Sequence, residues 1–165
     1  MRFGGAVLIA TLACLAPMFV GQAWAQKRSN EEQGIQASDF VGAWRLVKFT
    51  GTDAKGNVYN ILGEHPEGQV SYGVDGHVSA HLVNSDPTAR FMPAYNAYYG
   101  HYTLDLARGI VIHHVEGSNY PGFKGSIQER KFAFQGNELL LSADLNGMHQ
   151  VLVWKRLRDL QQSER

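Results

Sequence analysis

Side chains that can bind polar groups or transfer protons recur at alternate positions in the second half of the chain. They are Tyr98, Tyr102, His114, Glu116, Gln128 and Arg130, followed by the apolar Phe132. Alternate side chains of a β-strand share one face. If these faces meet, hydroxyl, imidazole, carboxylate and guanidinium groups come together. Such a set could orient the polar end of a ligand or act in acid–base chemistry.

The pairing of the two segments around Asp105 decides which of these groups meet. If residues 105–109 form the loop, Gly100 lies opposite His114, and one face carries Tyr98, Gly100, Tyr102, Ile112, His114 and Glu116. The other face then carries His101, Thr103 and His113. The first face is richer in aromatic side chains, and Gly100 leaves space opposite His114, so we assign it to the interior. A slip of one residue would exchange His113 for His114.

The next segment adds an arginine to the same interior. Phe132 and Phe134 require burial, and alternation places Gln128 and Arg130 on the same face. Three interpretations remain open for the polar group as a whole. Arg130 could pair with Glu116 in a purely structural cluster, or the group could orient the polar end of an apolar ligand. In the third, His114 acts as a base and Tyr98 or Tyr102 as a proton donor.

Short alternating segments separated by turn residues predict the elements that hold these side chains. The expected strands are 44–50, 58–62, 68–72, 77–83, 98–104, 110–116, 125–134, 139–143 and 148–156. Nearly all are joined as sequential hairpins, which must close to remove their edges. The fold class is therefore all-β: a single antiparallel up-and-down β-barrel of about 8–10 strands. One helical turn is expected at residues 38–41, capped by Ser38 or Asp39, and residues 84–96 could form a rim segment or a lid.

A tryptophan and an arginine at the two ends of the strand series predict how the barrel closes. Trp44 opens the first strand after Gly42, and Arg156 ends the last strand. We expect the indole to seal the narrow end as a floor, with the Arg156 guanidinium stacked over it. Both roles are structural.

The first 25 residues have the pattern of a secretory signal peptide. Arg2 precedes an apolar run, and Ala23-Trp24-Ala25 is a small-x-small cleavage site. The predicted organisation is a signal peptide at 1–25, a flexible tether at 26–38, the barrel at 39–156 and a polar tail at 157–165. Cleavage after Ala25 would place the protein in the periplasm or outside the cell. Lipidation at Cys14 is the alternative.

Composition argues against several classes of function. Lys plus Arg and Asp plus Glu both number 15, so the chain lacks the basic excess of a nucleic-acid-binding protein. His77 and His81 are too far apart on one strand to chelate one ion, and no cysteine could complete a zinc site with His101 and His113. We therefore expect no metal, no cofactor, no nucleic acid and no transmembrane segment.

Several motifs of the chain together resemble the lipocalin-like domain family, small single-domain proteins of bacteria and fungi. They are YYGHY at 98–102, VIHHVEGS at 111–118, Pro121, Gly125, QER at 128–130, FVGAWRLV at 40–47 and the hairpin at 68–81. The resemblance covers residues 39–156 and implies a calycin-like barrel with a ligand pocket. It implies no defined activity. The signal peptide departs from the usual intracellular form of the family.

The expected function is that of an exported, monomeric single-domain protein that binds a small, mainly hydrophobic or amphipathic molecule in the barrel cavity. The candidate ligand-binding residues are Tyr98, Tyr102, His114, Glu116, Gln128, Arg130 and Phe132. The alternative is an isomerase or cyclase acting on a polyketide- or terpenoid-like molecule, with His114, Tyr98 and Tyr102 as catalytic groups.

Overall fold

The structure, a computed structural model, describes residues 34–84 and 95–157. In chain order its elements are the 3₁₀ turn η1 (Ala37–Asp39) and the strands β1 (Gly42–Asp53), β2 (Val58–Asn60), β3 (Glu67–Tyr72), β4 (His77–Val83), β5 (Tyr95–Asp105), β6 (Ile110–Ser118), β7 (Ile127–Gln135), β8 (Glu138–Leu145) and β9 (Met148–Arg156). The predicted signal peptide, most of the tether, the interior of the 84–96 segment and nearly all of the tail lie outside the described residues.

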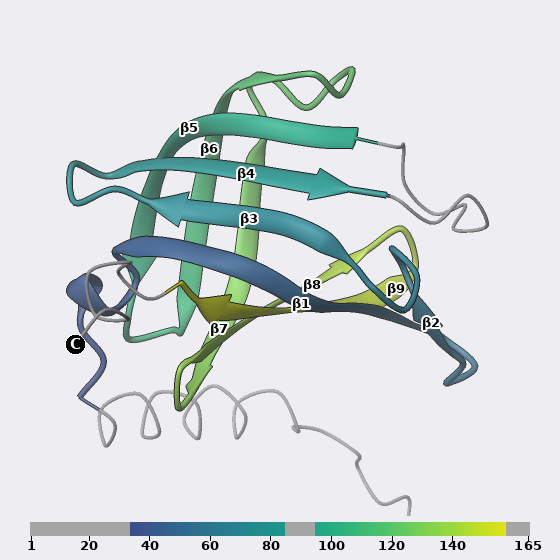
Figure 1. Ribbon diagram of the computed structural model, residues 1–165. Helices are drawn as coiled ribbons and strands as arrows, with labels where there is room; N and C mark the ends of the chain where they lie inside the picture. Colours follow the sequence, from purple (N-terminus) through teal and green to yellow (C-terminus); the bar gives the residue numbers. More distant parts are fainter. Residues whose placement is uncertain (1–33, 85–94, 158–165) are drawn as a thin grey trace, which may run out of the picture.

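Eight of these strands form a closed antiparallel barrel (Figure 1). Each strand from β3 to β8 pairs with the next strand in the chain, and β1 pairs with both β3 and β9. The short β2 pairs only with the far part of β1, at Thr50–Thr52. The predicted up-and-down barrel is confirmed, with β2 as an appendage to it.

An extra residue in β1 adapts this strand to both ends of the barrel. Leu46 pairs with Trp154 of β9, whereas Lys48 pairs with Val153, so Val47 is a β-bulge. The buried positions of β1 accordingly change from Trp44 and Leu46 to Phe49. One strand thereby supplies apolar side chains to both ends of the interior.

The narrow end of the barrel is filled by Phe40, which follows η1. Its side chain is fully buried and makes edge-to-face contacts with Phe132 (centroid distance 4.9 Å), Phe134 (5.2 Å) and Tyr72 (5.5 Å). The helical turn itself starts one residue earlier than predicted. Its first residue is preceded by Gln36, whose backbone N–H donates to the Asp39 carboxylate at 2.8 Å.

Trp44 and Arg156 hold this end closed. The Trp44 Nε1–H donates to the Phe40 carbonyl oxygen at 2.9 Å, and the Arg156 guanidinium carbon lies 4.0 Å from the centroid of the indole. The same guanidinium donates to the carbonyl oxygens of Val41, at 2.7 Å, and of Asp39. The sequence predicts the stacking but not the plug, because Phe40 enters from outside the strand series. We call this end of the barrel the floor and the opposite end the mouth.

Replacing Trp44 with alanine should destabilise the protein by about 3–5 kcal/mol, because it empties a buried aromatic site and removes the hydrogen bond to Phe40. Urea unfolding measures the loss. Arg45→Ala, at the exposed neighbouring position, is the control and should change the free energy of unfolding by less than about 0.5 kcal/mol. A loss below about 1 kcal/mol for Trp44→Ala would contradict the structural role of the indole.

Candidate functional site

The pairing of β5 with β6 places His113, and not His114, inside the barrel. Tyr102 pairs with His113, and His101 pairs with His114, one residue away from the predicted register. The reason lies in the loop. Asp105 remains in the ladder opposite Ile110, while its carboxylate accepts the Arg108 N–H at 3.0 Å and stabilises a shorter turn. His113 is 2% exposed, and the predicted interior positions of Ile112 and His114 are wrong.

A second irregularity follows at Gly100. This residue pairs with Val115, but the preceding Tyr99 pairs with Gly117, so Glu116 is the extra residue of a bulge. A Cβ atom on Gly100 would lie 1.9 Å from the His114 carbonyl oxygen. The glycine therefore permits close approach of two backbones. The prediction that it makes room for an imidazole ring is wrong.

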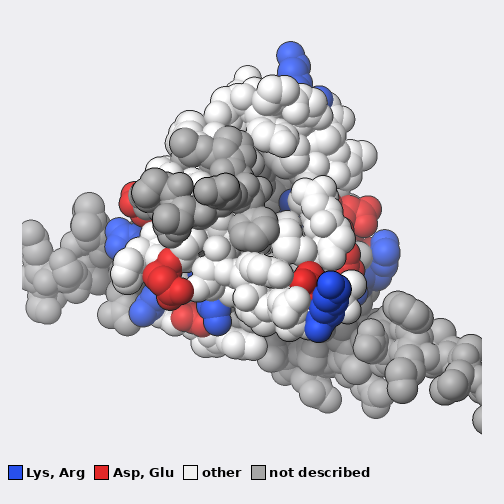
Figure 2. Space-filling model, turned by 90° about the vertical axis from the view of Figure 1, so that its right-hand side faces the viewer, with Lys and Arg blue, Asp and Glu red and all other residues white. Residues whose placement is uncertain are grey.

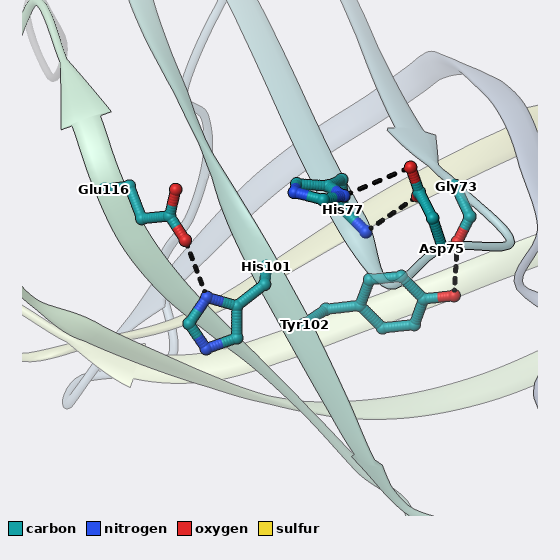
Figure 3. Close-up of polar contacts among 6 residues, drawn as sticks. All are labelled: Gly73, Asp75, His77, His101, Tyr102 and Glu116. Carbon is teal, nitrogen blue, oxygen red and sulfur yellow. Dashed lines mark hydrogen bonds and ion pairs between the residues drawn. The ribbon is translucent and has the colours of Figure 1, made fainter.

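Glu116 lies on the outer surface (Figure 3). Its Oε1 is 2.8 Å from Nδ1 of His101, and both side chains are about half exposed. The His101 ring in turn stacks on His114, with centroids 4.4 Å apart. The predicted pair between Arg130 and Glu116 is therefore absent, and neither His114 nor Glu116 can contribute to an interior site.

The mouth half of the barrel contains a cavity of about 150 Å³. Its wall includes Tyr98, His113, Tyr120, Phe123 and Arg130, together with Phe49, Val70, Ala80, Leu82, Asn96, Leu141, Leu145, Asn146, Gln150, Leu152 and Trp154. Figure 2 looks onto the mouth. Uncharged residues predominate among the described residues of this face, and most of the charged side chains lie toward its edges. The site is thus an apolar chamber with a few polar groups in its wall.

Two tyrosines hold the imidazole of His113 between them. Nε2 lies 2.9 Å from the hydroxyl oxygen of Tyr72, and Nδ1 lies 2.8 Å from that of Tyr98. Burial, with a contribution from the Arg130 charge, lowers the pKa of His113 to about 3. Burial raises the pKa of Tyr98 to about 12. All three groups are therefore neutral at neutral pH, and none is poised to exchange a proton there.

Arg130 brings a positive charge to the cavity wall. Its guanidinium donates to the Gln128 side-chain oxygen at 3.1 Å and to the Glu129 carbonyl oxygen at 2.8 Å. Gln128 is held in turn by its donation to the Ser126 hydroxyl at 2.9 Å. No carboxylate forms an ion pair with Arg130 within the described ranges 34–84 and 95–157.

Two further polar atoms in the cavity wall are buried without a hydrogen-bond partner in the described part of the chain. They are Nε1 of Trp154 and the side-chain oxygen of Asn96. Buried polar groups are nearly always paired in folded proteins. Unpaired groups in a cavity wall are therefore candidate contacts for a bound molecule.

The structure separates the predicted site residues into three groups. Tyr98 and Arg130 line the cavity, and Gln128 positions Arg130. Tyr102 and Phe132 pack in the floor half, where the Tyr102 hydroxyl donates to the Gly73 carbonyl oxygen at 3.0 Å (Figure 3). His114 and Glu116 lie outside.

Sequence reasoning missed three important residues of the site. Tyr72 and Trp154 follow the inward alternation of their own strands, Val70 to Tyr72 and Leu152 to Trp154, so the pattern could have identified both. His113 depended on the length of the preceding loop, which the sequence pattern left open.

Across the described residues, no group of three or more His, Cys, Asp or Glu side chains is arranged to hold a metal ion. In the same residues, no helix is long and apolar enough to cross a membrane.

Acid should destabilise the fold through His113. The imidazole has a pKa near 6.5 when unfolded and about 3 when folded, so between these values the unfolded chain binds a proton that the folded chain excludes. The free energy of unfolding should therefore fall as the pH drops below 6.5, by up to roughly 1.4 kcal/mol per pH unit. Urea unfolding between about pH 7 and about pH 4.5 measures this slope. His113→Gln should flatten it, and equal slopes for the two proteins would contradict the neutral, buried histidine.

Comparison with known sequences agrees with this architecture. No curated protein sequence matches the chain. The model of the family described as "Lipocalin-like domain" matches residues 41–157, which spans the barrel from β1 to the end of β9. The lipocalin-like barrel fold suggests the binding of small molecules in general. The match covers most of the chain, and with the closed barrel and its cavity it shows that the chain belongs to the lipocalin-like domain family.

Proposed function

We propose that this protein is exported and binds a small, mainly apolar molecule in the mouth half of its barrel. The observation that carries the proposal is the cavity of about 150 Å³, with apolar side chains over most of its wall. Apolar cavities of this size bind benzene. The ligand should therefore be about as large as one aromatic ring, with any larger part extending toward the mouth.

The wall of the cavity also favours a ligand with one polar end. Aliphatic side chains of β3, β4 and β8, such as Val70, Leu82 and Leu141, offer apolar contact. Tyr98, His113 and Arg130 bring polar atoms from β5, β6 and β7. A few placed polar groups in an apolar pocket are typical of sites that orient a small molecule.

The alternative of an isomerase or cyclase has weaker support. The proposed base, His114, is on the outside of the barrel. The histidine that does line the cavity has a pKa of about 3 and both ring nitrogens next to tyrosine hydroxyls. Such an imidazole is a poor proton acceptor at neutral pH, so binding is the better supported function.

Filling the cavity should prevent binding. Ala80 lines the cavity and is 4% exposed, so Ala80→Leu adds three carbon atoms to a space that holds about one ring. Calorimetric or NMR titration with toluene should show an affinity at least about tenfold lower than that of the wild type. Ala133→Leu makes the same change on the outward side of β7 and should leave toluene binding unchanged. Equal affinities for wild type and Ala80→Leu would mean that toluene binds elsewhere.

Export rests on Arg2, the apolar run after it and the cleavage site Ala23-Trp24-Ala25. Expressed in a Gram-negative host, the protein should accumulate in the periplasm with Gln26 as its first residue. N-terminal sequencing or intact mass spectrometry of the periplasmic fraction tests this. An acylated N-terminus at Cys14 would establish a lipoprotein instead, and a full-length product in the cytoplasm would contradict export.

A further inference from the structure

In the two hydrogen bonds that His113 forms with Tyr72 and Tyr98, the donor and the acceptor can be assigned. A neutral imidazole has one N–H donor and one acceptor nitrogen. Since both nitrogens of His113 lie within 2.9 Å of a tyrosine hydroxyl oxygen, one tyrosine must donate to the ring and the other must accept from it.

Tyr72 is the tyrosine that must donate. Its side chain is 2% exposed, it does not line the cavity, and its hydroxyl has no partner other than Nε2 of His113 in the described part of the chain. If Tyr72 accepted from His113, its own hydroxyl hydrogen would be buried without an acceptor, which is costly. Nε2 is therefore the acceptor, and the proton of the neutral ring is on Nδ1.

This tautomer makes Tyr98 a donor toward the cavity. Its hydroxyl oxygen accepts the Nδ1–H of His113, so its own hydrogen is free for another acceptor. Tyr98 lines the cavity and has no other side-chain hydrogen-bond partner in residues 34–84 and 95–157. The chain of hydrogen bonds thus ends with an O–H group that faces a bound molecule.

Two further groups in the cavity wall, Arg130 and Trp154, can only donate hydrogen bonds. Arg130 lines the same cavity, has no carboxylate partner in residues 34–84 and 95–157, and has N–H groups beyond the two used by Gln128 and Glu129. The buried Nε1–H of Trp154 has no acceptor in the described residues. The unpaired oxygen of Asn96 does not discriminate between ligands, because rotation of the amide exchanges its acceptor and donor ends.

We infer that the ligand carries a carboxylate, which accepts hydrogen bonds from the Arg130 guanidinium and from the Tyr98 hydroxyl. A carboxylate accepts hydrogen bonds, donates none and compensates a positive charge, and it matches the planar guanidinium in a bidentate pair. The inference rests on the proposed binding function and adds the chemical class of the ligand. The ligand is thus a small aromatic or short-chain carboxylic acid.

The tautomer of His113 can be tested without any ligand. A ¹H–¹⁵N spectrum of histidine-labelled protein at neutral pH should show His113 protonated at Nδ1 and unprotonated at Nε2. The spectrum of His113→Gln assigns the resonances by their loss. Protonation at Nε2 would overturn the donor role of Tyr98.

Titration with benzoate and with toluene tests the carboxylate. Arg130→Met keeps most of the side-chain volume. It should lower the affinity for benzoate by about tenfold or more, since a charge-assisted hydrogen bond is lost. Toluene affinity should change by less than about threefold. Tyr98→Phe should lower the affinity for benzoate by about fivefold or more. Tyr102→Phe is the matched control and should leave this affinity unchanged, because the Tyr102 hydroxyl donates to the Gly73 carbonyl oxygen in the floor half.

The outcomes separate this inference from the proposed function. If the wild type binds toluene but not benzoate, or if Arg130→Met weakens both equally, the carboxylate is wrong and the apolar binding site stands. If Tyr98→Phe leaves benzoate affinity unchanged, the role of the Tyr98 hydroxyl is overturned. If the folded wild type binds neither probe, the proposed function fails, and the inference fails with it.

Discussion

The bulge at Val47 is the constraint on which the interior of this barrel depends. β1 closes the barrel by pairing with both β3 and β9, so its inward side chains must serve the floor and the mouth. Strict alternation after Trp44 and Leu46 would direct Lys48 inward, and a buried, unpaired ammonium group is strongly unfavourable. The one extra residue directs Phe49 inward instead, where it lines the cavity. Closure, floor and cavity are thus compatible within one strand because of a single irregularity.

The barrel interior is divided into a filled half and a hollow half, and His113 lies at their boundary. On the floor side, the rings of Phe40, Tyr72, Tyr102, Phe132 and Phe134 pack edge to face. On the mouth side, smaller side chains such as Val70 and Ala80 leave space. The bond from Tyr72 to His113 crosses this boundary. The packed floor therefore fixes the imidazole, and the imidazole fixes the Tyr98 hydroxyl in the cavity wall.

The strands, their order and the inward face of β7 could be predicted from the sequence, because turn residues and period-two alternation report directly on them. The inward face of β6 could not. The register of β6 depends on whether Asp105 belongs to the loop or to the ladder. In the structure Asp105 belongs to the ladder, and its carboxylate accepts the Arg108 N–H within the turn that follows. Because His113 and His114 are adjacent, either register directs one histidine inward, and the histidines alone do not distinguish the two registers. Phe40 was missed as the plug because alternation describes residues within strands, and Phe40 precedes the first one.

In the proposed function, the distribution of charge gives the cavity its selectivity. Glu116, the carboxylate that could pair with Arg130 in the predicted register, is directed outward by the observed register of β5 and β6 and bonds to His101 on the surface. Among the described residues, the guanidinium therefore has only the neutral oxygens of Gln128 and Glu129 as partners. A hydrocarbon of suitable size could enter the cavity, but it would displace water from this cation without replacing the lost hydrogen bonds. Sites built to hydrogen-bond a ligand group discriminate strongly against analogues that lack it. In the proposed function, the apolar wall sets the size of the bound molecule, and the Arg130 charge, which has no carboxylate partner among the described residues, decides which molecules of that size are retained.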